Sequence, residues 1–250
     1  MIDLKDYSKK YSQQYKKKFS FERVLIKSRR ERVLTSVKKH THKNILEIGC
    51  GLDPIFQFCE DYDHYTVVEP SSSFAEHAQK LAQGKDGITI LSGYLEDVYG
   101  SLAGKPEFDF IIMSGILHEV SDPNRLLHAI NEVCQVETVV HINVPNVRSF
   151  HRLLAYEMGL IRSLFEKSEM EKKFQRNTRF DKETLFKIVE KNGFRVISFG
   201  TYFIKPFKNS QIEKIVEKNI VDISFLEGLE KLIKYMPEMG SEMYVDVKKK

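Results

Sequence analysis

The stretch that decides the fold is Asn-Ile-Leu-Glu-Ile-Gly-Cys-Gly, residues 44–51, an apolar run that ends in two glycines. The apolar residues predict a buried strand, and the glycines predict a tight turn directly after it. Glycine adopts backbone conformations closed to other residues and lets a ligand approach the main chain. Glu47 adds a carboxylate at the mouth of this turn. We therefore expect a ligand-binding loop here.

A dinucleotide-binding loop is the main alternative, because its G-x-G-x-x-G pattern also follows a strand. The third glycine would fall at position 54, which is Pro54. Asp53 would also repel the pyrophosphate that such a loop holds on the amides of the next helix. The loop suits a cofactor that is cationic where it meets the protein.

The order Glu47-x-Gly49-x-Gly51 resembles the first motif of the class I S-adenosylmethionine (SAM) methyltransferases, E-x-G-x-G. SAM carries an ammonium and a sulfonium group, which suit a loop that bears carboxylates. The resemblance implies a SAM site that contains these three residues together with Cys50 and Asp53.

A second acid follows the next expected strand, residues 64–68. Glu69 lies 20 positions after Gly49, the distance over which a βαβ unit places an acid near a bound ribose. A carboxylate there accepts hydrogen bonds from both ribose hydroxyls, and the resemblance assigns this place to Glu69 and the adjoining Pro70.

The third motif departs from the family pattern. An expected strand at 88–91 leads to Gly93, and the family usually has an acid just after that glycine to bind the adenine amino group. Here the position holds Tyr94. Tyr94 either stacks on the adenine beside Leu95 or only packs, and the polar contact can pass to the acids at 96 and 97.

The fourth motif follows the most strand-like run of the chain, residues 108–113. Ser114 opens the loop, and Leu-His-Glu-Val at 117–120 resembles the family pattern L-E-H-V with acid and histidine exchanged. Open α/β sheets bind ligands at the carboxyl ends of such strands. We expect Ser114 to contact the cofactor. Glu119 is expected to contact the substrate, or else to orient a histidine or cap the next helix.

Methyl transfer from a sulfonium requires alignment of donor and acceptor, and removal of a proton when the acceptor is a hydroxyl. Histidine suits that task near neutral pH. His118 is the first candidate base because it follows the cofactor-facing strand, and His151 is the second because it lies in an expected substrate-binding insertion. Arg148, Arg152, Arg176 and Arg179 are candidates for gripping a phosphate or carboxylate of the acceptor. A structural role is the alternative for each of them.

Strands and helices alternate along the chain, which implies a doubly wound, mostly parallel α/β sheet. The resemblance implies seven strands, a Rossmann-like methyltransferase fold and an antiparallel last strand. We divide the chain into an amino-terminal helical cap (1–43), a SAM-binding core (44–145), a substrate-pocket insertion (146–180) and a completing part (181–250) with a helical insertion at about 205–240.

The composition of the chain limits its class. Its 250 residues, 42% of them hydrophobic, can bury one substantial core. Three cysteines without C-x-x-C spacing argue against a disulfide framework and a zinc site, so we expect no metal and a reducing cytoplasm. No apolar run approaches the roughly 18 residues of a membrane span.

The positive charge is concentrated at the start of the chain, since residues 1–43 hold 14 Lys and Arg against 4 Asp and Glu, and the rest holds 25 against 31. Such a leader indicates a solvated helix face or contact with nucleic acid or a membrane surface. We prefer the first interpretation. In related methyltransferases an amino-terminal helix often covers the cofactor, which makes Tyr11 a candidate lid residue.

We expect a SAM-dependent methyltransferase with a small-molecule acceptor, acting on a hydroxyl of a nucleotide-linked sugar or another surface-glycan precursor. The run 145–152 and Ile-Lys-Pro at 204–206 resemble a branch common among bacterial surface-polysaccharide and secondary-metabolite enzymes. The alternatives are an RNA or protein methyltransferase and a non-catalytic SAM-binding subunit. We expect no nucleic-acid partner, and the chain lacks the N-P-P-Y motif expected for a planar amino nitrogen.

Overall fold

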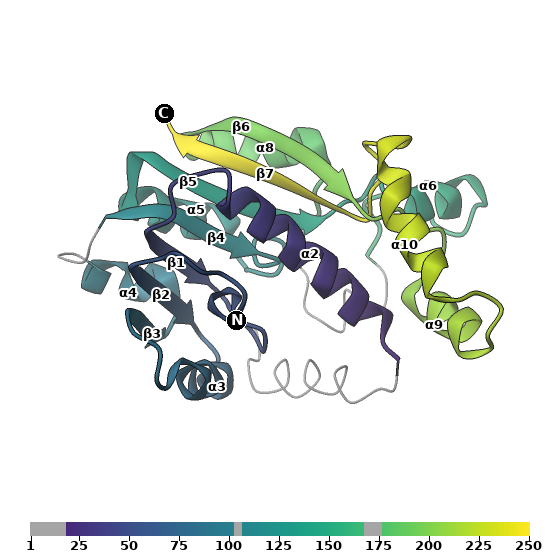
Figure 1. Ribbon diagram of the computed structural model, residues 1–250. Helices are drawn as coiled ribbons and strands as arrows, with labels where there is room; N and C mark the ends of the chain where they lie inside the picture. The colour runs from purple at the N-terminus through teal and green to yellow at the C-terminus, as the bar shows by residue number, and fades with distance from the viewer. Residues whose placement is uncertain (1–18, 103–106, 168–176) are drawn as a thin grey trace.

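A computed structural model describes residues 19–102, 107–167 and 177–250 of the chain (Figure 1). Seven strands form one sheet in the order β3-β2-β1-β4-β5-β7-β6. The strands are β1 (Asn44–Ile48), β2 (His64–Glu69), β3 (Ile88–Ser92), β4 (Phe108–Ser114), β5 (Cys134–Pro145), β6 (Phe194–Tyr202) and β7 (Glu242–Lys249). The strands β1 to β5 pair in parallel, and β7 lies antiparallel between β5 and β6. The expected doubly wound sheet with an antiparallel last strand is confirmed.

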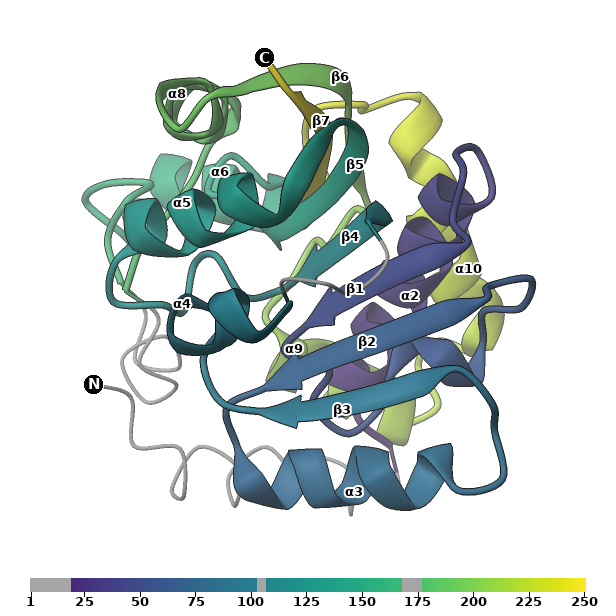
Figure 2. The ribbon, with the colours of Figure 1, turned by 90° about the vertical axis from the view of Figure 1, so that its left-hand side faces the viewer.

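Helices cover both faces of this sheet (Figures 1 and 2). One face carries α2 (Phe21–Val37), η1 (Ile55–Gln57) and α3 (Ser72–Ala82), and the other carries α4 (Leu95–Val98), α5 (Pro123–Val133) and α8 (Lys182–Lys191). The remaining helices are η2 (Tyr99–Leu102), α6 (Phe150–Glu157), α9 (Asn209–Glu217), α10 (Ile223–Lys231) and η3 (Leu232–Lys234). None of the helices in the described ranges combines the length and apolar character needed to cross a bilayer.

The alternation of side chains along β1 explains why its apolar run is continuous. Leu46 and Ile48 enter the core under α4, α5 and α8, whereas Ile45 enters the core under α2 and α3. A strand buried on both faces has no solvated side on which polar residues would recur. Glu47 lies on the same face of β1 as Ile45. It is the one acidic residue within this apolar run, and its carboxylate is buried.

Local signals set several element boundaries. The Asp122 carboxylate accepts hydrogen bonds from the amides of Asn124 and Arg125 at the start of α5. Strand β6 ends at Tyr202, because the next residue, Phe203, has a φ of 60°, outside the extended region. Pro54 precedes a single 3-10 turn, η1, since the chain must return to begin β2.

A third core joins the start of α2 to the helices of the 205–240 segment. It consists of apolar residues from α2, from the end of β6 and from α9 and α10: Phe21, Leu25, Tyr202, Phe203, Ile212, Leu226 and Leu229. The Phe21 and Phe203 rings meet edge to face with centroids 5.5 Å apart. This core fixes the start of α2, which lies near α9 and α10 in Figure 1.

A buried ion pair also fastens α2 to the sheet. Arg29 of α2 donates from Nε to the Glu242 carboxylate at 2.7 Å and from a second guanidinium nitrogen as well. Tyr202 donates its hydroxyl to the same carboxylate at 2.5 Å. Burial acts against the charge of Arg29, but the Glu242 carboxylate raises its pKa above the usual value. The Arg29 guanidinium therefore stays charged.

We expect Glu242→Ala to lower the free energy of unfolding by about 3–5 kcal/mol, because Arg29 would remain buried without its carboxylate. Adding Arg29→Met to this variant should recover much of the loss, since no uncompensated charge then remains. Urea unfolding followed by circular dichroism measures both. A Glu242→Ala protein with an unchanged unfolding midpoint would show that the ion pair does not fasten α2.

Candidate active site

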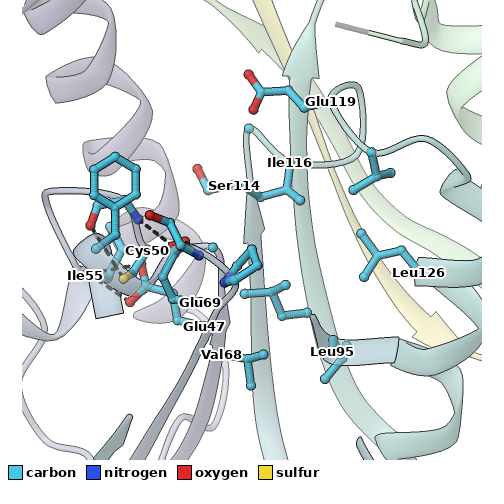
Figure 3. Close-up of a pocket in the computed structure, with 18 of the residues that line it drawn as sticks. Glu47, Cys50, Ile55, Val68, Glu69, Leu95, Ser114, Ile116, Glu119 and Leu126 are labelled. Carbon is cyan, nitrogen blue, oxygen red and sulfur yellow. Dashed lines mark hydrogen bonds between the residues drawn. The ribbon is translucent and has the colours of Figure 1, made fainter. Parts of the chain in front are cut away.

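A pocket opens at the carboxyl edge of the sheet, where β1 and β4 lie side by side (Figure 3). This is the point at which the strand order reverses, since β2 and β4 flank β1 on opposite sides. The pocket is lined by all the predicted cofactor residues that the structure describes and by two predicted residues of the acceptor side: Glu47, Gly49, Cys50, Gly51, Asp53, Glu69, Pro70, Tyr94, Leu95, Ser114, His118 and Glu119. Tyr11 lies outside the described residues.

The glycines of the first motif take the conformations that the sequence suggests. Gly49 has a φ of 71° and Gly51 a φ of 57°, which are costly for other residues. The Gly49 amide donates to the Val68 carbonyl at 2.8 Å, so the loop begins against β2. A Cβ atom on Gly49 would lie 2.4 Å from the Ile116 side chain. Gly49 therefore also makes room for the turn after β4.

Glu47, on β1, stabilises this loop through hydrogen bonds. Its carboxylate accepts hydrogen bonds from the Ile55 amide at 3.0 and 3.2 Å and from the Tyr65 hydroxyl at 2.7 Å. Burial raises the pKa of Glu47 to about 8, against the effect of these hydrogen bonds. Both oxygens are thus engaged within the protein, and the carboxylate fixes the far end of the loop.

Glu69, at the end of β2, holds the near end of the same loop. Its two oxygens accept from the amides of Gly51 at 3.1 Å and Ser71 at 2.8 Å. Burial raises the pKa of Glu69, and the amides act in the opposite direction. Each carboxylate oxygen has a second lone pair. Glu69 can therefore accept further hydrogen bonds from a pair of hydroxyl groups in the pocket.

The third motif brings one of the two candidate acids to the pocket. Glu96 lines it, whereas the Asp97 carboxylate is 2.9 Å from an Arg125 guanidinium nitrogen on the surface. Tyr94 precedes α4 and is half-buried, which raises the pKa of its hydroxyl. Leu95 packs almost completely into the core.

His118 and Glu119 lie on the turn that follows β4, and both side chains are buried in the pocket wall. The His118 Nε2 atom is 3.6 Å from a Glu119 carboxylate oxygen. The carbonyl of His118 accepts from the amides of Asn177 and Thr178, at 2.9 and 3.1 Å. These contacts fix the turn against the segment that leads to α8.

His151 does not line the pocket formed by the described residues. It lies on α6, with its Nδ1 atom 3.1 Å from the Ser149 hydroxyl. Burial and the positive charges of Lys205 and Arg152 lower the pKa of His151 to about 2. The ring is therefore neutral at physiological pH and weakly basic.

Three of the four candidate arginines also lie away from the pocket lining that the structure describes, and Arg176 lies outside the described residues. Arg152 donates to the Leu164 carbonyl at 2.6 Å, and Arg179 donates to the same carbonyl at 3.4 Å. Arg148 is exposed. Arg152 and Arg179 thus fix the segment that follows α6.

The resemblance suggested that an amino-terminal helix covers the cofactor, but sequence reasoning did not identify the residues of α2 that line the pocket. Glu22, Ile26, Arg29 and Arg30 all line it. The spacing of the last three, at i, i+3 and i+4, is that of one helix face and was the available signal. The Arg30 guanidinium lies 3.8 Å from the centre of the Phe58 ring. Within the described residues no group of His, Cys, Asp or Glu side chains is arranged to hold a metal ion.

Comparison with known proteins agrees with this geometry. A family model described as a methyltransferase domain matches residues 19–199, more than half of the chain. None of the curated proteins matches the chain.

Several solved structures share the fold. A possible histamine N-methyltransferase from Thermotoga maritima is 22% identical, with a TM-score of 0.58 over 99% of this chain and 100% of that one. The mitomycin 7-O-methyltransferase MmcR is 14% identical, with a TM-score of 0.56 over 89% of this chain and 53% of that one. The [4+2]-cyclase SpnF is 14% identical, with a TM-score of 0.55 over 87% and 80%. With its family match, sheet order and glycine loop, the chain belongs to the class I SAM-dependent methyltransferases, and SAM is its cofactor.

Proposed function

We propose that the protein transfers a methyl group to a hydroxyl of a small molecule, such as a nucleotide-linked sugar or another surface-glycan precursor. The observation that carries the proposal is that one pocket joins the glycine loop and Glu69 to His118. A methyltransferase needs its cofactor residues and its acceptor base in the same cavity.

The described residues fit SAM. Gly49 and Gly51 leave room for a ligand against the main chain, and Glu69 has acceptor capacity for the ribose hydroxyls. Tyr94 and Glu96 border the adenine end, and Ser114 borders the methionyl end, because the pocket runs from β3 across β2 and β1 to β4. When bound, SAM supplies an electrophilic methyl group on a sulfonium.

His118 is the proposed base. Its side chain lines the pocket, and the Glu119 carboxylate at 3.6 Å favours the imidazolium that forms when His118 takes the hydroxyl proton. Arg30, from α2, also lines the pocket and provides a positive charge for an anionic part of the acceptor, such as a phosphate. Arg29 is engaged by Glu242.

Two other functions are kept as outcomes of the tests. The basic leader supports RNA or protein as a substrate, although its first 18 residues lie outside the described part of the chain. The likeness to a cyclase supports a SAM-binding protein with another role, because one fold hosts several reactions.

For the cofactor site, we expect Glu69→Ala to weaken the affinity for SAM about tenfold or more, since a charge-assisted hydrogen bond is lost. Asp97→Ala is the matched control, because this acid faces Arg125 outside the pocket, and it should bind SAM normally. Titration calorimetry with SAM and NAD measures both variants. Equal SAM affinity in the two variants would remove Glu69 from the site, and tight binding of NAD without SAM would contradict the cofactor.

For the base, we expect His118→Ala to bind SAM normally but to lose about 10²- to 10⁴-fold in single-turnover rate, the usual contribution of a general base. The acceptor is first obtained by a labelled-methyl screen of small-molecule, RNA and protein fractions of a cell extract. Melting temperatures of the same variant exclude a folding defect. Near-normal turnover in a folded His118→Ala protein would make His151 the next residue to test, and label confined to RNA or protein would overturn the small-molecule acceptor.

A further inference from the structure

A chain of buried polar side chains runs from the pocket into the sheet. The Ser114 hydroxyl lies 3.1 Å from Asn143 Oδ1, and Asn143 Nδ2 lies 3.0 Å from His141 Nε2. His141 Nδ1 lies 2.6 Å from Asp246 Oδ1. The sheet register explains the alignment, because Ser114 pairs with Asn143 across β4 and β5, and His141 pairs with Asp246 across β5 and β7. Of these four side chains, Ser114 lines the pocket.

In the hydrogen-bonded series from Ser114 to Asp246, each residue donates to the next one. Asp246 is an acceptor when ionised, and although burial acts against its charge, the hydrogen bond with His141 lowers its pKa. His141 must then donate from Nδ1, which leaves Nε2 of the neutral ring as an acceptor for the Asn143 amide. The amide oxygen of Asn143 in turn accepts the proton of the Ser114 hydroxyl.

The His141 ring is fully buried within the sheet. The Tyr244 ring stacks on it with centroids 5.6 Å apart, and the Arg32 guanidinium lies 5.2 Å from the centre of that ring. The Asn143 Nδ2 atom, a donor, lies 3.0 Å from His141 Nε2, so a proton on Nε2 would face another donor. The Asn143 amide therefore keeps the hydrogen bonds in one direction, from Ser114 to Asp246.

We infer that Asp246 and His141 are positioning residues that, through Asn143, make Ser114 a hydrogen-bond acceptor for the ammonium group of SAM. Ser114 has its proton committed to Asn143, so its hydroxyl offers lone pairs to the pocket. This inference rests on the proposed placement of SAM, in which Glu69 holds the ribose and the methionyl part reaches the ends of β1 and β4. An ammonium donates hydrogen bonds and accepts none, so it requires a hydroxyl held in this sense.

A simple structural role explains the chain less well. The strands β5 and β7 already pair from Val139 and Lys248 to Pro145 and Glu242. An ionised carboxylate buried beside a histidine adds a desolvation cost that an apolar pair would avoid. Because Ser114, at one end of this hydrogen-bonded series, lines the pocket, a role in ligand binding explains why the buried carboxylate is present.

The test is Asp246→Asn, which keeps the shape of the side chain and reverses the direction of the hydrogen bonds. The new amide can donate to His141 Nδ1, which moves the ring proton to Nε2. The Asn143 amide must then turn, and the Ser114 hydroxyl points its proton at the ammonium. We expect the Kd of S-adenosylhomocysteine to rise about tenfold or more. The Kd of 5′-methylthioadenosine, which has no amino-acid part, should stay within about twofold.

Two further variants make the test specific. Ser114→Ala should give the same selective loss, and the double variant should lose no more than either single one, because both act through one hydroxyl. Asp109→Asn is the matched control, since this carboxylate accepts only from the Asn44 amide among the hydrogen bonds described for it and lies outside the pocket lining. It should bind both ligands normally.

The outcomes distinguish a failure of the inference from a failure of the proposed SAM placement. Equal losses for both ligands, or no loss for either, in a folded Asp246→Asn protein would overturn the inference while leaving the SAM site in place. If Asp246→Asn does not fold, unchanged S-adenosylhomocysteine affinity in Ser114→Ala would overturn it. A wild-type protein that binds neither ligand would overturn the proposed placement of SAM, and the inference with it.

Discussion

The structure of the site depends on the need to satisfy buried backbone amides in the loop between β1 and η1. A buried N–H without an acceptor is costly, and the chain reverses here without the hydrogen bonds of a helix. Glu47 accepts from Ile55 and Glu69 accepts from Gly51, so one carboxylate fixes each end of the loop. Because burial raises the pKa of both acids, these contacts come at a cost in desolvation. The shape of the cofactor pocket follows from them.

One wall of the pocket depends on α2, which precedes the sheet in the sequence. Its apolar residues pack on α9 and α10, and Arg29 binds Glu242 at the start of β7. The helix is thereby held by segments from the far end of the chain. Arg30, on the same face, remains as a positive charge at the pocket. An apparently solvated basic leader thus includes a wall of the site.

Three histidines show that the surroundings of an imidazole ring decide its chemical role. His118 borders the pocket beside a carboxylate, His151 is a weak base on α6, and His141 is enclosed within the sheet. The sequence contains the same imidazole in each case. Burial, neighbouring charges and hydrogen-bond partners determine whether the ring can take a proton, hold a direction of hydrogen bonding or only pack.

The sequence by itself determined the sheet and the cofactor edge, because both are written in short-range signals. An apolar run ending in Gly49 and Gly51, and an acid 20 positions later, are readable without knowing any distant contact. The tertiary structure alone decided that Glu47 supports the loop from within, that Arg152 already binds the Leu164 carbonyl, and which residues of α2 line the pocket. These facts depend on contacts between residues far apart in the chain, and no local pattern of residue types specifies which donor meets which acceptor.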